Sequence, residues 1–172
     1  MLISPEYLEL QKELHSRGDY GVSARKWTKR VNELAEVLSV RSLLDYGCGQ
    51  GLLSRQLPVT FDRIYQVREY DPAVLGKSSP PEYADLVYCG DVLEHVEPRF
   101  LEAVLDDLKR LARVAVFLVI ATRPAMKYLA DGRNAHLIVE PAFWWLRRLQ
   151  ERWITNEFSG NAGEFMFIGM TR

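Results

Sequence analysis

The stretch Leu43-Leu44-Asp45-Tyr46-Gly47-Cys48-Gly49-Gln50-Gly51 decides the fold of this chain. Its apolar start is typical of a buried strand. The three alternating glycines then predict a sharp turn in which main chain can approach a ligand closely, because glycine has no Cβ. Residues 52–57 are expected to begin a helix, so the stretch predicts a strand, a tight turn and a helix in succession.

The rest of the chain repeats the alternation of strand and helix. This alternation implies a mostly parallel sheet with helices on both faces. We expect strands at 41–46, 64–70, 84–89 and 113–121, and helices at 5–14, 23–38, 98–112 and 141–152. Residues 153–159 and 164–171 predict a closing antiparallel pair across a Gly160-Asn161-Ala162-Gly163 turn. Residues 73–83 and 122–139 are expected to be irregular.

Size and composition indicate a single domain in a reducing compartment. The chain has 172 residues, a net charge of −1 and two cysteines. We expect a helical cap at 1–40 and a Rossmann-like core at 41–172. The near-neutral charge does not favour nucleic acid as a partner. No signal peptide or membrane-spanning run is apparent, and two cysteines are too few for a disulfide framework, so we expect a cytoplasmic protein.

Two further segments carry polar side chains at the ends of expected strands. They are Glu69-Tyr70-Asp71-Pro72 and Asp91-Val92-Leu93-Glu94-His95-Val96. The carboxyl ends of parallel strands meet at one edge of a sheet, and open α/β sheets bind ligands there. The glycine turn belongs to the same edge, so the three segments predict one ligand site.

Together these segments resemble the class I S-adenosylmethionine (SAM)-dependent methyltransferases, in particular the compact bacterial and phage type. The D-x-G-x-G-x-G spacing differs from the dinucleotide fingerprint G-x-G-x-x-G. The resemblance implies SAM as cofactor, with its methionine part held by the turn. The cofactor-binding residues that it implies there are Asp45, Gly47, Cys48, Gly49 and Gly51. The alternative is a tight turn that binds nothing.

The resemblance also implies roles for the acids that follow. Asp71 would accept the ribose hydroxyls, although Glu69 falls on the same side of the strand and the sequence alone does not separate the two. A solvated turn acid before Pro72 is the alternative for Asp71. Asp91 would face the methionine end of the cofactor or the substrate.

His95 and His136 are the candidate catalytic residues. Each could orient the methyl acceptor or take its proton, since histidine titrates near neutrality. Each also has a structural alternative, His95 as a core or capping side chain and His136 as a lid residue bonded to backbone. We expect no metal, because H-x-x-H and C-x-x-C spacings are absent and SAM carries an already activated methyl group.

The chain departs from larger family members between the second and third expected strands. Only about a dozen residues, 72–83, fill that gap, which predicts a sheet trimmed at this edge. Backbone around Cys89 and Gly90, or residues 75–79, would then contact adenine, and Tyr20-Gly21 could form a lid. We expect methyl transfer to a small-molecule acceptor. The alternatives are a non-catalytic SAM-binding or scaffold domain and another nucleotide-using enzyme such as a dehydrogenase.

Overall fold

The computed structural model describes residues 1–16, 26–57 and 66–172. Within them, six strands form one sheet in the order β2-β1-β3-β4-β6-β5. The first four strands in that order are parallel, and β6 runs antiparallel to both β4 and β5. This is the Rossmann-like α/β sheet with a C-terminal antiparallel pair that the sequence predicts. β2 forms its edge, with no further strand beyond it among the described residues, in agreement with the expected trimming.

The elements lie close to the expected ranges. The strands are β1 (Ser42–Tyr46), β2 (Gln66–Tyr70), β3 (Ala84–Gly90), β4 (Ala112–Ala121), β5 (Ile154–Gly160) and β6 (Glu164–Met170). The α-helices are α1 (Pro5–Ser16), α2 (Thr28–Val37), α3 (Leu52–Gln56), α4 (Leu101–Leu111) and α5 (Ala142–Gln150). Two 3₁₀ turns, η2 (Leu93–His95) and η3 (Pro98–Phe100), separate β3 from α4.

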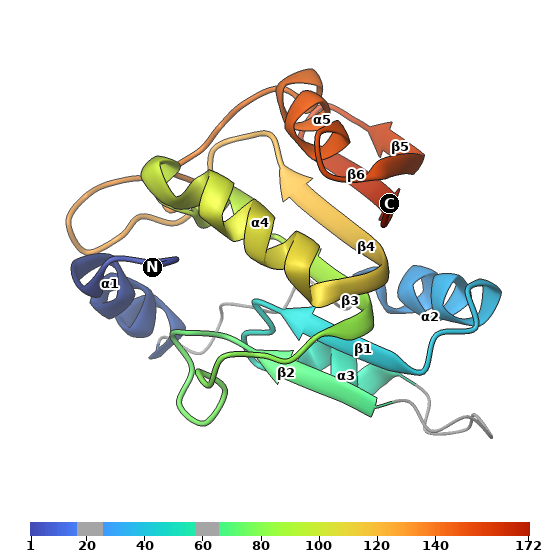
Figure 1. Ribbon diagram of the computed structural model, residues 1–172. Coiled ribbons are helices and arrows are strands. Elements are labelled where there is room, and N and C mark those ends of the chain that lie inside the picture. Colours follow the sequence, from blue (N-terminus) through green and yellow to red (C-terminus); the bar gives the residue numbers. More distant parts are fainter. Residues whose placement is uncertain (17–25, 58–65) are drawn as a thin grey trace.

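Alternate side chains of the central strands point to opposite faces of the sheet and pack into two separate hydrophobic cores. Leu44, Val87 and Val116 point to the face covered by α4 and α5, where Trp145 and Leu149 pack. Their neighbours in the chain point to the face covered by α2 and α3. Figure 1 shows α4 and α5 on one side of the sheet and α2 and α3 on the other. Two buried faces explain why β4 is nearly all apolar, as parallel strands of such sheets are.

Several boundaries differ from expectation for local reasons. The helix expected at 98–112 begins as the 3₁₀ turn η3, with Pro98 in its first turn, and ends at Leu111 because the chain extends into β4. The second helix begins at Thr28. The first residues of the helix expected at 23–38 and the lid at Tyr20-Gly21 lie outside the described residues, as do the first residues of the strand expected at 64–70.

The N-terminal helix is tied to the loop that follows β3. The backbone N–H and the hydroxyl of Ser4 donate to the Glu97 carboxylate at 2.8 and 2.9 Å. The Tyr7 hydroxyl donates to the His95 carbonyl oxygen at 2.6 Å, and Gln11 Nε2 donates to that hydroxyl at 2.7 Å. α1 therefore closes one side of the sheet's carboxyl edge (Figure 1). No described helix has the length and apolar character needed to cross a bilayer.

A matched pair of substitutions on α5 tests the packing of that helix. Trp145 is fully buried, whereas Phe143 is 69% exposed two residues earlier. We expect Trp145→Ala to lower the free energy of unfolding by about 3–5 kcal/mol, because it leaves a cavity in the core. Phe143→Ala should change it by less than about 0.5 kcal/mol. Urea denaturation of both variants measures the difference, and equal losses would contradict the described orientation of α5.

Candidate active site

A cleft of about 780 Å³ opens at the carboxyl edge of the sheet. Its floor comes from the ends of β1, β2 and β3, and its walls from α1 and from residues 121–136. All the predicted catalytic and cofactor-binding residues except Gly51 line this cleft, whereas Cys89 and residues 75–79, considered for adenine contact, do not. The cleft thus brings together segments up to about 90 residues apart in the chain.

The glycine turn leaves β1 with its backbone in the left-handed region. Gly47 has φ = 80°, and a Cβ on it would lie 2.3 Å from Cγ2 of Val92 in the loop after β3. The N–H groups of Gly47 and Cys48 donate to the Tyr70 carbonyl oxygen at 2.7 and 3.1 Å, which joins the turn to the end of β2. Burial raises the pKa of the Cys48 thiol to about 12, so the thiol stays protonated at neutral pH.

Gly51 supports the glycine turn but does not line the cleft. Its φ is 70°, and an added Cβ would lie 2.2 Å from Oε1 of Glu69. Glu69 itself accepts hydrogen bonds from Ser54 and pairs with Lys77 at 2.9 Å. Lys77 Nζ also donates to the Gly49 carbonyl oxygen at 3.2 Å. The loop 72–83 therefore braces the turn, and Glu69 lies among these supporting residues instead of along the cleft.

Asp45 presents a buried carboxylate oxygen that has no hydrogen-bond donor. The residue is 2% exposed, and its Oδ2 is buried without a partner. Burial, followed by the nearby charge of Glu69, raises its pKa to about 7. Asp45 therefore provides an acceptor in the cleft for a cationic donor that the protein itself does not supply.

Asp71 is held rigidly at the mouth of the glycine turn. Its Oδ2 accepts the Gly49 N–H at 3.0 Å and its Oδ1 accepts the Ala73 N–H at 2.9 Å. Nε2 of His15, from α1, lies 4.0 Å from Oδ2. Each carboxylate oxygen has two lone pairs, so both can accept a further hydrogen bond from a ligand. Asp71 lines the cleft and Glu69 does not, which separates the two acids that the sequence left unresolved.

The end of β3 brings Asp91 to the cleft, and Glu94 is buried nearby. Gly90 closes the strand, and Asp91 follows with φ = 55°, a conformation that Asp adopts more readily than most residues. Glu94 is fully buried in η2, and its Oε1 accepts the Ala121 N–H at 2.9 Å. Burial and then the neighbouring Asp91 raise the pKa of Glu94 well above its usual range.

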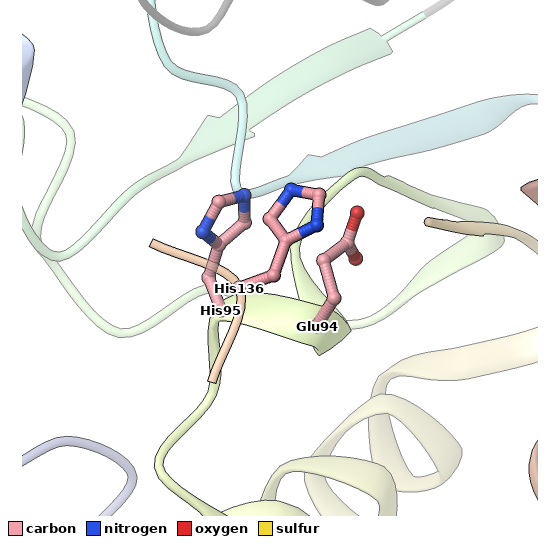
Figure 2. Close-up of side chains that lie close together, drawn as sticks. All are labelled: Glu94, His95 and His136. Carbon is pink, nitrogen blue, oxygen red and sulfur yellow. The ribbon is translucent and has the colours of Figure 1, made fainter. Parts of the chain in front are cut away.

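His95 and His136 come together across the cleft. Their ring centroids are 4.7 Å apart with the planes nearly perpendicular, and Figure 2 shows both rings beside Glu94. Burial, followed by the proximity of His136, lowers the pKa of His95 to about 3. Burial also lowers the pKa of His136. Both imidazoles are therefore neutral at physiological pH.

No individual site residue was predicted on the N-terminal helix. Tyr7, Gln11 and His15 line the cleft from α1 at spacings of four residues, so they lie on one helix face. Only that spacing could have indicated them, and it is equally typical of an ordinary core-facing stripe. On the opposite wall, Arg123 and Met126 also line the cleft, and Leu75, from the loop considered for adenine, is fully exposed.

The sequence matches the family described as "Methyltransferase domain" over residues 20–162. The match covers most of the chain, and the chain belongs to this family. No curated protein sequence matches it. The methyltransferase class predicted from the glycine turn and the two acidic segments is thereby confirmed.

Solved methyltransferase structures share the fold at low sequence identity. A complex of DhpI with S-adenosylhomocysteine (SAH) superposes with a TM-score of 0.63 at 16% identity, covering 96% of this chain and 97% of that chain. The N-methyltransferase NodS of Bradyrhizobium japonicum, also with SAH, gives 0.61 at 18%, covering 98% and 99%. The 1,6-didemethyltoxoflavin-N1-methyltransferase of Burkholderia thailandensis gives 0.68 at 13%, covering 99% and 92%.

The raised pKa of Asp45 predicts how the stability of the ligand-free protein depends on pH. The folded-state pKa of about 7 exceeds the ordinary 3.8, so the folded state disfavours the carboxylate. Ionisation of Asp45 therefore costs stability progressively from about pH 4 to pH 7, up to roughly 4 kcal/mol. We expect Asp45→Asn to stabilise the protein at pH 8 and to leave its stability nearly unchanged at pH 4.

Urea denaturation at pH 4, 6 and 8 measures this effect. Glu82→Gln is the matched control, because Glu82 is an exposed carboxyl near the amino end of β3. A stability difference between Asp45→Asn and the parent protein that does not grow with pH would contradict the described burial of Asp45.

Proposed function

We propose that the cleft binds SAM and transfers its methyl group to a small-molecule acceptor. The single observation that carries the cofactor assignment is the buried Oδ2 of Asp45, which has no donor. SAM bears an ammonium group, and a charge-assisted hydrogen bond to this oxygen would satisfy both partners. The carboxylate lies beside the turn at Gly47 and Cys48, and all three residues line the cleft that would take the ligand.

Different residues of the cleft would contact different parts of SAM. We assign the methionine part of SAM to Asp45 and to the backbone of Gly47, Cys48 and Gly49, with Gly51 supporting the turn from behind. Asp71 would accept the ribose hydroxyls with its remaining lone pairs, and Gly90 and Asp91 would border the cofactor at the end of β3. The neighbours DhpI and NodS were solved with SAH, which agrees with this use of the fold.

The reaction needs alignment more than proton transfer. When bound, SAM supplies a sulfonium methyl group, whose bond to sulfur breaks as the acceptor's O, N, S or C atom attacks, leaving the electron pair on sulfur. Holding the acceptor in line with that methyl group can provide much of the acceleration. His95, with a pKa of about 3, is a weak base. We therefore propose that His95 orients the acceptor, and that His136 is the better placed of the two to take a proton.

The size and charge of the site support a small acceptor. A cleft of about 780 Å³ falls within the range of small-molecule sites and is shared by cofactor and acceptor. The net charge of −1 offers no general attraction for nucleic acid. One structural neighbour is complexed with 1,6-didemethyltoxoflavin, a small molecule.

Two buried cysteine thiols that form no disulfide fit a cytoplasmic location. We also propose that residues 1–40 act as a helical cap on the core at 41–172.

Titration of Asp45 couples SAM binding to pH. The ammonium group of SAM should bind the carboxylate form, so binding below about pH 7 must release a proton from Asp45. We expect the SAM affinity of the parent protein to fall about tenfold per pH unit below 7. Calorimetry in buffers of different ionisation enthalpy measures the released proton directly.

Two variants test the assignment. Asp45→Asn should bind SAM at least about 30-fold more weakly, without the proton release, and Asp45→Ala combined with Asp71→Ala should abolish binding. Glu82→Gln should bind like the parent protein. Unchanged affinity in the double variant would refute the site, whereas SAM binding without turnover on any extract acceptor would favour a non-catalytic SAM-binding domain.

A further inference from the structure

Glu94, His95 and His136 form a cluster that the methyl-transfer chemistry does not require. One ligand-type atom from each residue lies within 4.8 Å of those of the other two. Two of the residues come from η2 after β3 and the third from the long segment after β4, and Figure 2 shows the His136 ring between the His95 ring and the Glu94 carboxylate. The fold thus brings together two imidazoles and a carboxylate from positions 41 residues apart.

Both imidazole rings are oriented by backbone carbonyls. Nδ1 of His95 lies 2.7 Å from the Ala135 carbonyl oxygen, and Nδ1 of His136 lies 2.6 Å from the Arg123 carbonyl oxygen. A carbonyl oxygen can only accept, so each neutral ring carries its proton on Nδ1 and its lone pair on Nε2. Metal-binding histidines are commonly fixed in this way, with one ring nitrogen donating to backbone and the other facing the ion.

The Glu94 carboxyl group is also held by the backbone through one of its two oxygen atoms. Oε1 of Glu94 accepts the Ala121 N–H at 2.9 Å, and Oε2 is buried without a hydrogen-bond donor. The side chain of Glu94 is hydrogen-bonded to the Asp91 carboxyl group, which adds a second acid to the pocket. No described lysine or arginine pairs with Glu94, so a metal ion that binds its carboxyl group would not have to displace a cation of the protein.

We propose that Glu94, His95 and His136 bind a divalent first-row transition-metal ion, on the acceptor side of the cleft. Imidazole ligands favour Zn²⁺, Co²⁺, Fe²⁺ or Mn²⁺ over Mg²⁺ and Ca²⁺, which prefer all-oxygen sites. Ligand atoms around such an ion lie about 3.0–3.5 Å apart, so the cluster must contract by about 1 Å on binding. His136, which is only partly buried, has room to make this movement.

Three protein ligands leave coordination positions open toward the cleft. If the proposed methyltransferase function holds, the ion indicates the class of methyl acceptor. That class is a small molecule with a hydroxyl, carboxylate or similar oxygen donor beside the atom to be methylated. Such a donor would bind at the open positions, and the ion would hold the acceptor in place beside the cofactor. The orienting role proposed for His95 would then act through the metal.

Cobalt binding tests the site without reference to catalysis. Protein stripped of metal with a chelator is titrated with Co²⁺ in the absence of SAM, and binding is followed by the visible absorption of the ion and by calorimetry. We expect one saturable site per chain. Mg²⁺ at tenfold excess should not displace the bound Co²⁺, whereas Zn²⁺ should.

Two ligand variants and one control decide the assignment. Glu94→Gln and His136→Ala should each weaken Co²⁺ binding at least about 30-fold. His136 lies at the cleft surface, so its variant should fold even where the change at Glu94 does not. Cys48→Ser should bind Co²⁺ like the parent protein. Absence of saturable binding, equal affinity in parent and both ligand variants, or loss of binding in Cys48→Ser instead, would overturn the metal site.

The acceptor class has its own probe. Acetohydroxamate, a simple bidentate oxygen ligand, is added to the Co²⁺-loaded protein, and a saturable change in the visible spectrum is expected where coordination positions are open. An unchanged spectrum would overturn the inferred acceptor class. SAM calorimetry on the same samples separates the two proposals: intact SAM binding without a metal site refutes only this inference, and a metal site without SAM binding refutes only the proposed cofactor.

Discussion

The rest of the structure depends on the position of β1 in the centre of the parallel sheet. β1 is paired on one side with β2 and on the other with β3, and both of its faces are buried. The chain cannot continue straight beyond Tyr46 without leaving the core, so it must turn within a few residues. Because β2 and β3 are parallel to β1, the loops that follow all three strands meet at the same edge. The cleft is a direct consequence of this shared direction.

The same constraint gives the cleft its unusual charge. Asp45 occupies the strand itself, paired in register with Glu69 and Tyr88 on the neighbouring strands. It is therefore held in the sheet at a depth where water cannot solvate it, and its pKa rises. Asp71, one residue beyond β2, reaches backbone N–H donors instead. Two acids at adjacent strand ends thus have different environments, and only the deeper one is left without a donor.

The sequence predicted the sheet well because each strand carries its own local signal. Leu43-Leu44, Val87 and the apolar run of β4 indicate strands without knowledge of their neighbours, and the glycine turn fixes where β1 ends. The supporting contacts carried no such signal. Lys77 reaching the Gly49 carbonyl, Tyr7 reaching the His95 carbonyl and His136 reaching His95 all join residues far apart in the chain. Their partners are set by tertiary packing, which a search for short motif spacings does not detect.

The two ends of the cleft are chemically complementary to different ligands. At the β1 end, the carboxyl groups of Asp45 and Asp71 suit a ligand with a cation and sugar hydroxyls. At the η2 end, two neutral imidazoles with fixed tautomers and a buried carboxylate suit a cation that offers further coordination positions. The Asp91 carboxyl group contributes negative charge at the η2 end, where it acts on Glu94 and His136. A sulfonium and a divalent ion can share one cleft only if carboxylates separate them, because like charges in a low dielectric repel strongly. Asp45 and Asp91 line the cleft and Glu94 is buried beside Asp91, so acids are in place to meet that requirement.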